Sequence, residues 1–382
     1  MFDFNKIKNY KNDEEFNKKL KHLGLHYIND FDTGLTLIKY DQTKKNIYDF
    51  NNDLVSFSRG LIFDRKTRKV LCLPPGKSLN IIPFSQMVGT ENWTKVDIEE
   101  FIDGTMINCF CHNEKWILST RSSIGARSKW FSKKTFKELF DEAKGNLDLE
   151  KLNSSFCYTF VLRHPENRIV TNYKTPNICL VQVREIKEDS YEEIPLEQIK
   201  VELSQKNIEI DIPKNYSINL PEEINNILKD MSFQEQGLVF KKGNLRSKVR
   251  NIEYENAKFL RGNNKNLLYK YIELRQKDLL EDYLKYFPEY KDNFDNYRKS
   301  IEKTTMKLFN IYKKSYIFKT INKNNIPFEL RPLCYEMHGI YINSNNKWER
   351  GNVIHFFNSL EPARIIFVLN YQKNKEFRKK TL

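Results

Sequence analysis

The sequence has no long apolar run and few residues that could cross-link the chain or bind a metal. No apolar stretch reaches the roughly 18–20 residues needed to cross a bilayer, so we expect no membrane-spanning segment. The six cysteines show neither CxxC spacing nor a Cys/His ligand pattern, which argues against a disulfide framework and a zinc site. Residues 1–16 are charged throughout and do not resemble a signal peptide. We therefore expect an intracellular protein in the reducing cytoplasm.

Three familiar catalytic patterns are also missing. The sequence contains no Gly-x-x-x-x-Gly-Lys-Thr phosphate loop and no His-Glu-x-x-His zinc motif. Nothing in it is typical of a Ser-His-Asp hydrolase. The sequence therefore predicts no metal site, and any catalytic function must depend on other residues.

The composition is that of a folded protein with a basic surface. A chain of 382 residues that is 40% hydrophobic and 13% aromatic can form cores, and its length favours two domains because single cores stop growing beyond roughly 250–300 residues. An excess of 64 Lys+Arg over 50 Asp+Glu gives a net charge of +14. This excess favours a polyanionic partner, nucleic acid before membrane. A lysine-rich, solvated surface without a binding role would explain the same charge.

The first two thirds of the chain read mainly as strands. Short β-branched and aromatic runs separated by turn residues predict antiparallel sheets between residues 56 and 249. Two amphipathic helices are expected, at residues 132–143 and 221–231. The predicted strands cover residues 60–64, 69–73, 105–111, 116–120, 156–161, 178–183 and 237–240.

The character of the sequence changes after about residue 255. Residues 256–320 carry Leu, Tyr and Ile at helical spacing, interrupted at Phe287-Pro288, and two more apolar helical segments follow. We predict a first domain over residues 1–255 and a mainly α-helical second domain over residues 256–382. The tyrosines of this helical region could stack on RNA bases, although their spacing favours a core: Tyr269, Tyr271, Tyr283, Tyr286 and Tyr290.

The segment Phe101-Ile102-Asp103-Gly104 precedes a predicted strand and carries the most informative pattern. It resembles the Lys-x-Asp-Gly motif of the covalent nucleotidyltransferases, namely RNA ligases, DNA ligases and mRNA capping enzymes. In that family the lysine amine attacks the α-phosphate of ATP or GTP, and Asp-Gly forms the turn that presents it. An Asp-Gly turn alone is common and identifies nothing.

Other segments occur in the order found in phage-type RNA ligases, and together they cover about residues 59–254. Residues 59–63 resemble the Arg-Gly-x-x-Phe strand, and residues 75–78 resemble the basic loop after it. Residues 159–161 and 167–170 resemble the Glu-Phe-Val and Asn-Arg-Ile-Val segments. Residues 236–239 and 248–250 resemble Glu-Gly-x-Val and the closing Lys-x-Lys. The resemblance implies an α+β fold, with an antiparallel nucleotidyltransferase domain like that of RNA and DNA ligases and a helical C-terminal domain.

The departures from this pattern fall on the residues that carry the chemistry. Phe101 stands where the nucleophilic lysine belongs, and a phenyl ring cannot form a phosphoramidate. Thr159 replaces a glutamate that binds the ribose, and Gln236 replaces a glutamate that helps to organise a metal. The resemblance therefore implies a degenerate, viral-type member of the family.

The residues that would contact phosphate are largely retained. The resemblance implies a nucleotide- or phosphate-binding role for Arg59, Lys77, Asp103, Gly104, Arg121, Lys248 and Arg250. Arg121 and Arg250 each replace a lysine of the family pattern, so the charge is kept but the geometry changes. A pocket that keeps its cations and loses its nucleophile predicts binding of a polyanion without reaction.

Three hypotheses follow. The first is a catalytically degenerate RNA-ligase-like protein that binds RNA or nucleotide. The second is an active ATP- and Mg²⁺-dependent RNA ligase with a different nucleophile; Lys95 and Lys115 lie nearest in sequence, but neither is on the Asp-Gly turn. The third is a scaffold whose helical C-terminal domain binds a protein.

Overall fold

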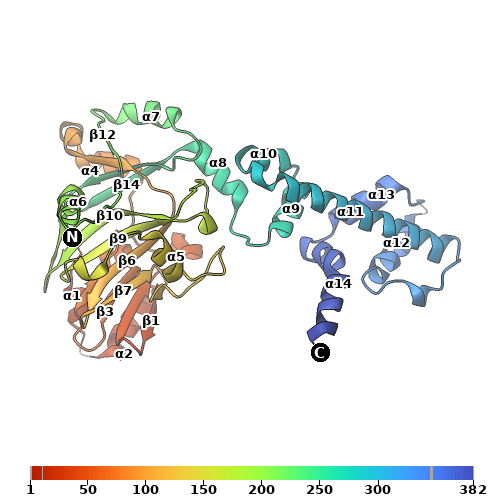
Figure 1. Ribbon diagram of the computed structural model, residues 1–382, viewed down its shortest axis with the longest axis horizontal. Helices are drawn as coiled ribbons and strands as arrows, with labels where there is room; N and C mark the ends of the chain where they lie inside the picture. The colour runs from red at the N-terminus through yellow and green to blue at the C-terminus, as the bar shows by residue number, and fades with distance from the viewer. Residues whose placement is uncertain (1, 11, 345–346, 382) are drawn as a thin grey trace. The chain divides into compact units, whose positions relative to one another are not determined.

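The computed structural model describes residues 2–10, 12–344 and 347–381, with the side chains of residues 45, 90, 373 and 377–381 left aside. The chain divides into two compact units, Met1–Phe259 and Leu260–Leu382 (Figure 1). The division and the boundary predicted at residue 255 both fall within α8 (Ile252–Arg261). Independent folding of the two parts stays a prediction.

The first sheet of the first unit has two buried faces. Its strands follow the order β1-β2-β3-β4 and all pairs are antiparallel. In β3, Leu61 and Phe63 pack among the N-terminal helices, whereas Ile62 packs with Phe110 of the next sheet. The period of two along a strand explains this alternation. The elements are β1 (His26–Asp30), β2 (Leu35–Lys39), β3 (Arg59–Asp64), β4 (Val70–Cys72), α1 (Asn5–Lys8), α2 (Asp13–His22) and α3 (Asp53–Phe57).

The second sheet is six-stranded and antiparallel, in the order β11-β10-β9-β6-β7-β8. Two helices, α5 (Phe136–Ala143) and α6 (Leu196–Gln205), cover one face with Phe140, Ile199 and Leu203. The predicted helix start at residue 132 was too early, because Thr135 caps the helix with a Thr135–Glu138 capping box. The strands are β6 (Thr105–His112), β7 (Lys115–Thr120), β8 (Ser123–Ile124), β9 (Phe156–Arg163), β10 (Asn177–Ile186) and β11 (Tyr191–Ile194).

The third sheet presents a charged face toward the interior of the unit. Its order is β12-β5-β13-β14, again antiparallel. One face, with Ile98, Leu238 and Phe240, packs against Phe84 and Trp93. Because side chains alternate along a strand, the neighbouring positions project from the other face. The elements are β5 (Asp97–Glu100), β12 (Asn215–Tyr216), β13 (Gly237–Lys242), β14 (Leu245–Arg250), α4 (Ile81–Val88) and α7 (Ile224–Asp230).

The second unit is helical throughout its described residues. Tyr271, Tyr283 and Tyr286 are buried in it, so the core interpretation of these three tyrosines is confirmed. The predicted interruption at Phe287-Pro288 is a short 3₁₀ turn, and a π-helix, Lys313–Ile317, follows α11 directly. The helices are α9 (Leu267–Gln276), α10 (Leu280–Tyr286), α11 (Lys291–Tyr312), α12 (Arg331–Ser344), α13 (Arg350–Ser359) and α14 (Pro362–Thr381).

The fold class predicted from the sequence is therefore confirmed: antiparallel sheets with helices come first, and a helical region follows. All seven predicted strands are present. Within the described part of the chain, no helix combines the length and apolarity needed to cross a membrane.

Candidate functional site

A cavity of about 310 Å³ lies between the third sheet and the six-stranded sheet of the first unit. Met106 and Val161 line it from the six-stranded sheet, and Val239 lines it from the third sheet. We call it the cationic cavity, because it is also lined by five basic side chains: Arg59, Arg246, Lys248, Arg250 and Lys258.

Phe101 enters this cavity because the chain crosses from one sheet to the other there. β5 ends at Glu100 and β6 begins at Thr105, so residues 101–104 form the crossing. The Phe101 N–H donates a hydrogen bond to the Gly237 carbonyl at 2.8 Å, which holds the crossing against β13. A residue at position 101 is therefore fixed at the cavity wall.

Gly104 is required by the close approach of two strands. A β-carbon at this position would lie 2.4 Å from the carbonyl oxygen of Leu162, and the φ angle of +150° also disfavours other residues. The Asp-Gly turn of the sequence motif is thus explained by packing as well as by presentation of residue 101.

Asp103 also lines the cavity, but its carboxylate is occupied. Oδ2 accepts hydrogen bonds from the Val170 and Thr171 N–H groups at 3.0 and 2.9 Å, and Oδ1 accepts one from the Tyr254 hydroxyl at 2.7 Å. Burial, then the charge of Asp103, raises the pKa of the Tyr254 hydroxyl. Asp103 therefore ties the crossing to two distant segments.

Strand β14 supplies three of the cations from one face. Arg246, Lys248 and Arg250 alternate along the strand with Ser247 and Val249, so their side chains share the face toward the cavity. Burial and the nearby guanidinium of Arg250 lower the pKa of the Lys248 amine to about 7. Burial lowers the pKa of the Arg246 guanidinium to about 10.

The Phe101 ring lies against two of these cations. Lys248 Nζ is 5.3 Å and Arg250 Cζ is 5.5 Å from the ring centroid. Both distances fall within the range of cation–π attraction. The family pattern has a lysine here, which would add a third positive charge. The phenyl ring of Phe101 instead attracts the two cations beside it and partly offsets their mutual repulsion.

Several N–H groups of the cavity arginines have no acceptor among the described residues. Arg59 Nε, Arg246 Nη1 and Arg250 Nε are buried and have no hydrogen-bond partner within the described part of the chain. Arg59 does donate through Nη1 to the Gly76 carbonyl at 3.2 Å. Because buried polar groups are almost always satisfied, such donors indicate a place for an anion or water.

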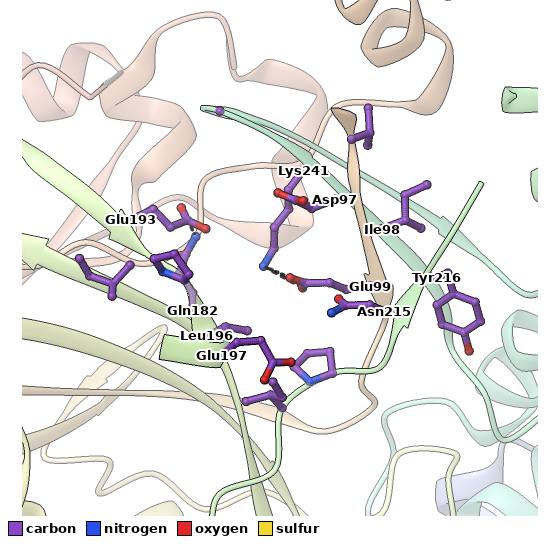
Figure 2. Close-up of a pocket in the computed structure, with 16 residues that line it drawn as sticks. Asp97, Ile98, Glu99, Gln182, Glu193, Leu196, Glu197, Asn215, Tyr216 and Lys241 are labelled. Atoms are coloured by element: carbon purple, nitrogen blue, oxygen red, sulfur yellow. Dashed lines mark hydrogen bonds and ion pairs between the residues drawn. The ribbon is translucent and has the colours of Figure 1, made fainter. Parts of the chain in front are cut away.

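A larger cavity of about 550 Å³ adjoins the first and has the opposite character. Figure 2 shows Lys241 reaching Glu99, with a contact of 2.7 Å between amine and carboxylate, and Gln182 reaching Glu193. Asp97, Glu193 and Glu197 add negative charge to its wall, which disfavours phosphate. Glu99 lines both cavities, and its pairing with Lys241 leaves it little ability to offset the cations of the smaller one.

Three predicted site residues lie outside the lining of the cationic cavity. Lys77 places its amine 5.3 Å from the Phe50 ring centroid and lines a small neighbouring cavity. Arg121 donates to the Tyr40 carbonyl at 2.6 Å and stacks on the same tyrosine. Thr159 is fully buried, with its hydroxyl 3.0 Å from Asn108 Oδ1. The other predicted residues come together: Arg59, Phe101, Asp103, Gly104, Gln236, Lys248 and Arg250.

Sequence reasoning missed Arg246 and Lys258. The signal for Arg246 was available, because the alternation of residues 246, 248 and 250 predicts a common face once this segment is assigned as a strand. Lys258 lies on α8, and its place at the cavity depends on how that helix packs.

The carboxylates of the site do not form a metal centre. Among the described residues, no three His, Cys, Asp or Glu side chains gather as a metal-binding set. Of the three acidic residues in the lining, Glu99 is paired and Asp103 is hydrogen-bonded, which leaves Glu100. The residues fit the phosphates of a nucleotide, and they do not fit a divalent ion held by the protein.

No family model matches the sequence. Two viral proteins do match: an RNA ligase of Rhodothermus phage RM378, 35% identical over 99 residues, and a bifunctional polynucleotide kinase/RNA ligase of Autographa californica nuclear polyhedrosis virus, 28% identical over 177 residues. These matches cover 23% and 42% of this chain, and 22% and 24% of the relatives. The chain thus covers less than a quarter of either relative.

Solved structures resemble the chain more weakly. An archaeal ATP-dependent RNA ligase has a TM-score of 0.45 at 13% identity, over 70% of this chain and 68% of that one. A Naegleria gruberi RNA ligase with ATP and Mn has a TM-score of 0.37 at 13% identity, over 48% and 57%. Likeness at this level carries no argument, so any family assignment rests on the two sequence matches.

Proposed function

We propose that this chain, for which the two viral matches support an RNA ligase-type family, binds the phosphate groups of a nucleotide or an RNA end in the cationic cavity. One observation carries the proposal: three partly buried arginines line this cavity, and each has a buried N–H group that no described residue accepts. A phosphate provides several acceptor oxygens and a negative charge, which is what such donors lack.

The covalent route of the ligase family is excluded at position 101. That route forms a bond between a lysine nitrogen and the α-phosphorus, and the Phe101 ring has no atom that could form it. Gln236, at the cavity wall, lacks the charge of the family's glutamate, and Thr159 replaces a second one. We infer that the protein is catalytically degenerate. It would bind RNA in the cytoplasm without reacting with it. The net charge of +14 favours that partner.

The proposal is tested by equilibrium binding of ATP and of inorganic tripolyphosphate, which has phosphates but no base or sugar. Arg246→Gln removes one charged donor and should weaken both ligands about ten-fold or more, as the loss of a charged hydrogen bond does. Lys174→Gln is the matched control, since Lys174 is exposed. Wild-type protein that binds neither ligand would contradict the proposal, as would equal binding by Arg246→Gln.

An oligonucleotide series separates a nucleotide site from an RNA-end site. The same RNA carrying a 5′-phosphate or a 5′-hydroxyl differs only in the group that the cavity would hold. Tighter binding of the phosphorylated RNA that depends on Arg246 assigns the cavity to an RNA end, and binding of ATP alone assigns it to a nucleotide.

A second candidate function is an active ligase in which Lys248 is the nucleophile. Its amine lies 5.3 Å from the Phe101 ring, inside the cavity, and its pKa of about 7 leaves a large neutral fraction near pH 7. The step would form an Nζ–phosphorus bond to the α-phosphate of a nucleoside triphosphate, release pyrophosphate and lose one amine proton. Lys95 and Lys115 do not line the cavity.

Labelling distinguishes this second function from binding alone. Incubation with α-labelled ATP, followed by denaturing electrophoresis, should leave label on the wild type and none on Lys248→Arg if Lys248 reacts. Absence of label from wild type that binds ATP supports the degenerate protein. A scaffold role through the helical unit stays as the third possibility; a stable protein partner without nucleotide or RNA binding would favour it.

A further inference from the structure

The helical unit exposes aromatic rings that have lysines beside them. Phe318 is 60% exposed and Tyr335 is 74% exposed, whereas other aromatic side chains of this unit, such as Tyr283 and Phe287, are buried. We define the aromatic–lysine surface as Lys313, Tyr316, Phe318, Lys323, Tyr335 and His338, which lie on the π-helix after α11, the loop after it and α12. Exposed aromatic clusters of this kind indicate contact with a partner.

Contacts among these side chains fall into two groups, one around Phe318 and one around Tyr316. Lys313 Nζ lies 5.3 Å from the Phe318 ring centroid, and Lys323 Nζ lies 4.6 Å from that of Tyr316. The Tyr316 ring lies 4.4 Å from the His338 ring. Tyr335 is one helical turn before His338 on α12, so the two share a helix face.

The charge of this surface is positive and is not neutralised locally. Lys313, Lys323 and the neighbouring Lys314 and Lys319 form no ion pair within the described residues. Two acidic residues of the adjoining segment are occupied: Glu329 by Lys307 and Gln372, and Glu336 by Arg364. A protein ligand for an apolar helix face would not require four unpaired lysines, whereas a polyanion would.

Polar atoms below the rings are also left without partners. Tyr312 Oη, Ser315 Oγ and His338 Nδ1 are buried, and none of them forms a hydrogen bond with a described residue. All three belong to the π-helix region and the facing turn of α12, where the helix departs from its regular pattern. A π-helix often marks a functional segment.

We propose that the aromatic–lysine surface binds a single-stranded polynucleotide, with bases stacked on the exposed rings of Phe318 and Tyr335 and phosphates on the lysines. Each base has a π face that can stack on an aromatic ring, and each phosphate can attract the ammonium group now beside that ring. The surface belongs to the second unit alone and does not depend on the proposed function of the cationic cavity. The aromatic–lysine surface would then bind the polynucleotide strand, and the cationic cavity would bind a phosphate group.

The test uses the full-length protein and the fluorescence anisotropy of a labelled single-stranded oligouridylate. Phe318→Ala and Tyr335→Ala should each weaken binding roughly five-fold or more, because stacking contributes that much per base. Phe31→Ala is the matched control: Phe31 is 79% exposed and has Arg65 over its ring, but it lies in the first unit. Since all three rings are exposed, thermal unfolding should be unchanged.

Salt dependence tests the lysines separately. The plot of log affinity against log KCl concentration should lose about 0.7 of slope for each of Lys313→Gln and Lys323→Gln, as expected for contacts with a single strand. A hairpin RNA should bind more weakly than the single strand.

Two outcomes would overturn the proposal. One is wild-type affinity for the oligouridylate in the Phe318→Ala, Tyr335→Ala double variant. The other is loss of oligouridylate binding in Arg246→Gln but not in that double variant, which would assign the strand to the cationic cavity. ATP binding measured in the same double variant should equal that of the wild type, so failure here is distinguishable from failure of the cavity proposal.

Discussion

Replacing Lys248 with methionine should stabilise the protein at pH 7, although it removes a residue of the proposed binding site. The amine is surrounded by Arg59, Arg246 and Arg250, and burial together with these charges lowers its pKa from 10.5 to about 7. The folded state therefore disfavours the charged amine that the unfolded chain carries. Methionine has a similar length and no charge, so it fills the space without that cost.

The size of the effect follows from the two pKa values. At about 1.4 kcal/mol per pKa unit, a fall from 10.5 to about 7 sets a ceiling of roughly 5 kcal/mol. Lys248 is half-buried and its contact with the Phe101 ring is lost in the variant, so we expect a gain of about 1–3 kcal/mol.

The same shift determines the pH dependence. Between pH 7 and about 10 the unfolded chain keeps the proton of Lys248 while the folded protein loses it, so the wild type becomes more stable as the pH rises. The variant should lack this rise and should be closest to the wild type near pH 10. Higher pH is less informative, because buried tyrosines such as Tyr158, whose pKa burial raises, then ionise in the unfolded chain.

Urea denaturation followed by circular dichroism, at several values between pH 7 and about 10, measures both quantities. Lys174→Met is the control, because Lys174 is exposed and its removal should leave the pH dependence unchanged. The reasoning is refuted if Lys248→Met is less stable than the wild type at pH 7, or if its stability rises with pH as the wild type's does.

Three further changes test the residues around the cavity by urea denaturation. Gly104→Ala should cost at least about 2 kcal/mol, because its β-carbon would lie 2.4 Å from the Leu162 carbonyl oxygen. The control Gly339→Ala, in a helix with open space, should be neutral or slightly stabilising, and equal effects of the two changes would contradict this reasoning. Asp103→Asn should cost about 1.5–3 kcal/mol, since an amide cannot accept all the hydrogen bonds that the carboxylate accepts; an unchanged urea midpoint would refute this. Phe101→Leu keeps the bulk and removes both cation–π contacts, so a loss of about 1–3 kcal/mol is expected, and a stable variant would show that the ring contributes only volume.

The sequence predicted the elements whose patterns are local. The seven strands follow from short β-branched runs between turns, and the helical region follows from apolar residues at three-to-four spacing. Where a prediction failed, a neighbouring residue decided the outcome: the helix expected from residue 132 begins at Phe136, because the Thr135 side chain caps it. Short strands such as β5 and β12 were missed because few residues carry their signal.

The identity of residue 101 was determined by the sequence alone, and it excludes a lysine adduct at that position whatever the fold. The alternation of Arg246, Lys248 and Arg250 is visible in the sequence, but it places them on one face only once the structure shows that residues 245–250 form a strand. The sequence could not show that Glu99 is paired with Lys241, or that Thr159 lies outside the cavity lining. Those facts, and the lowered pKa of Lys248, were decided only by the tertiary structure, because burial and charge interactions depend on segments that are distant in the chain.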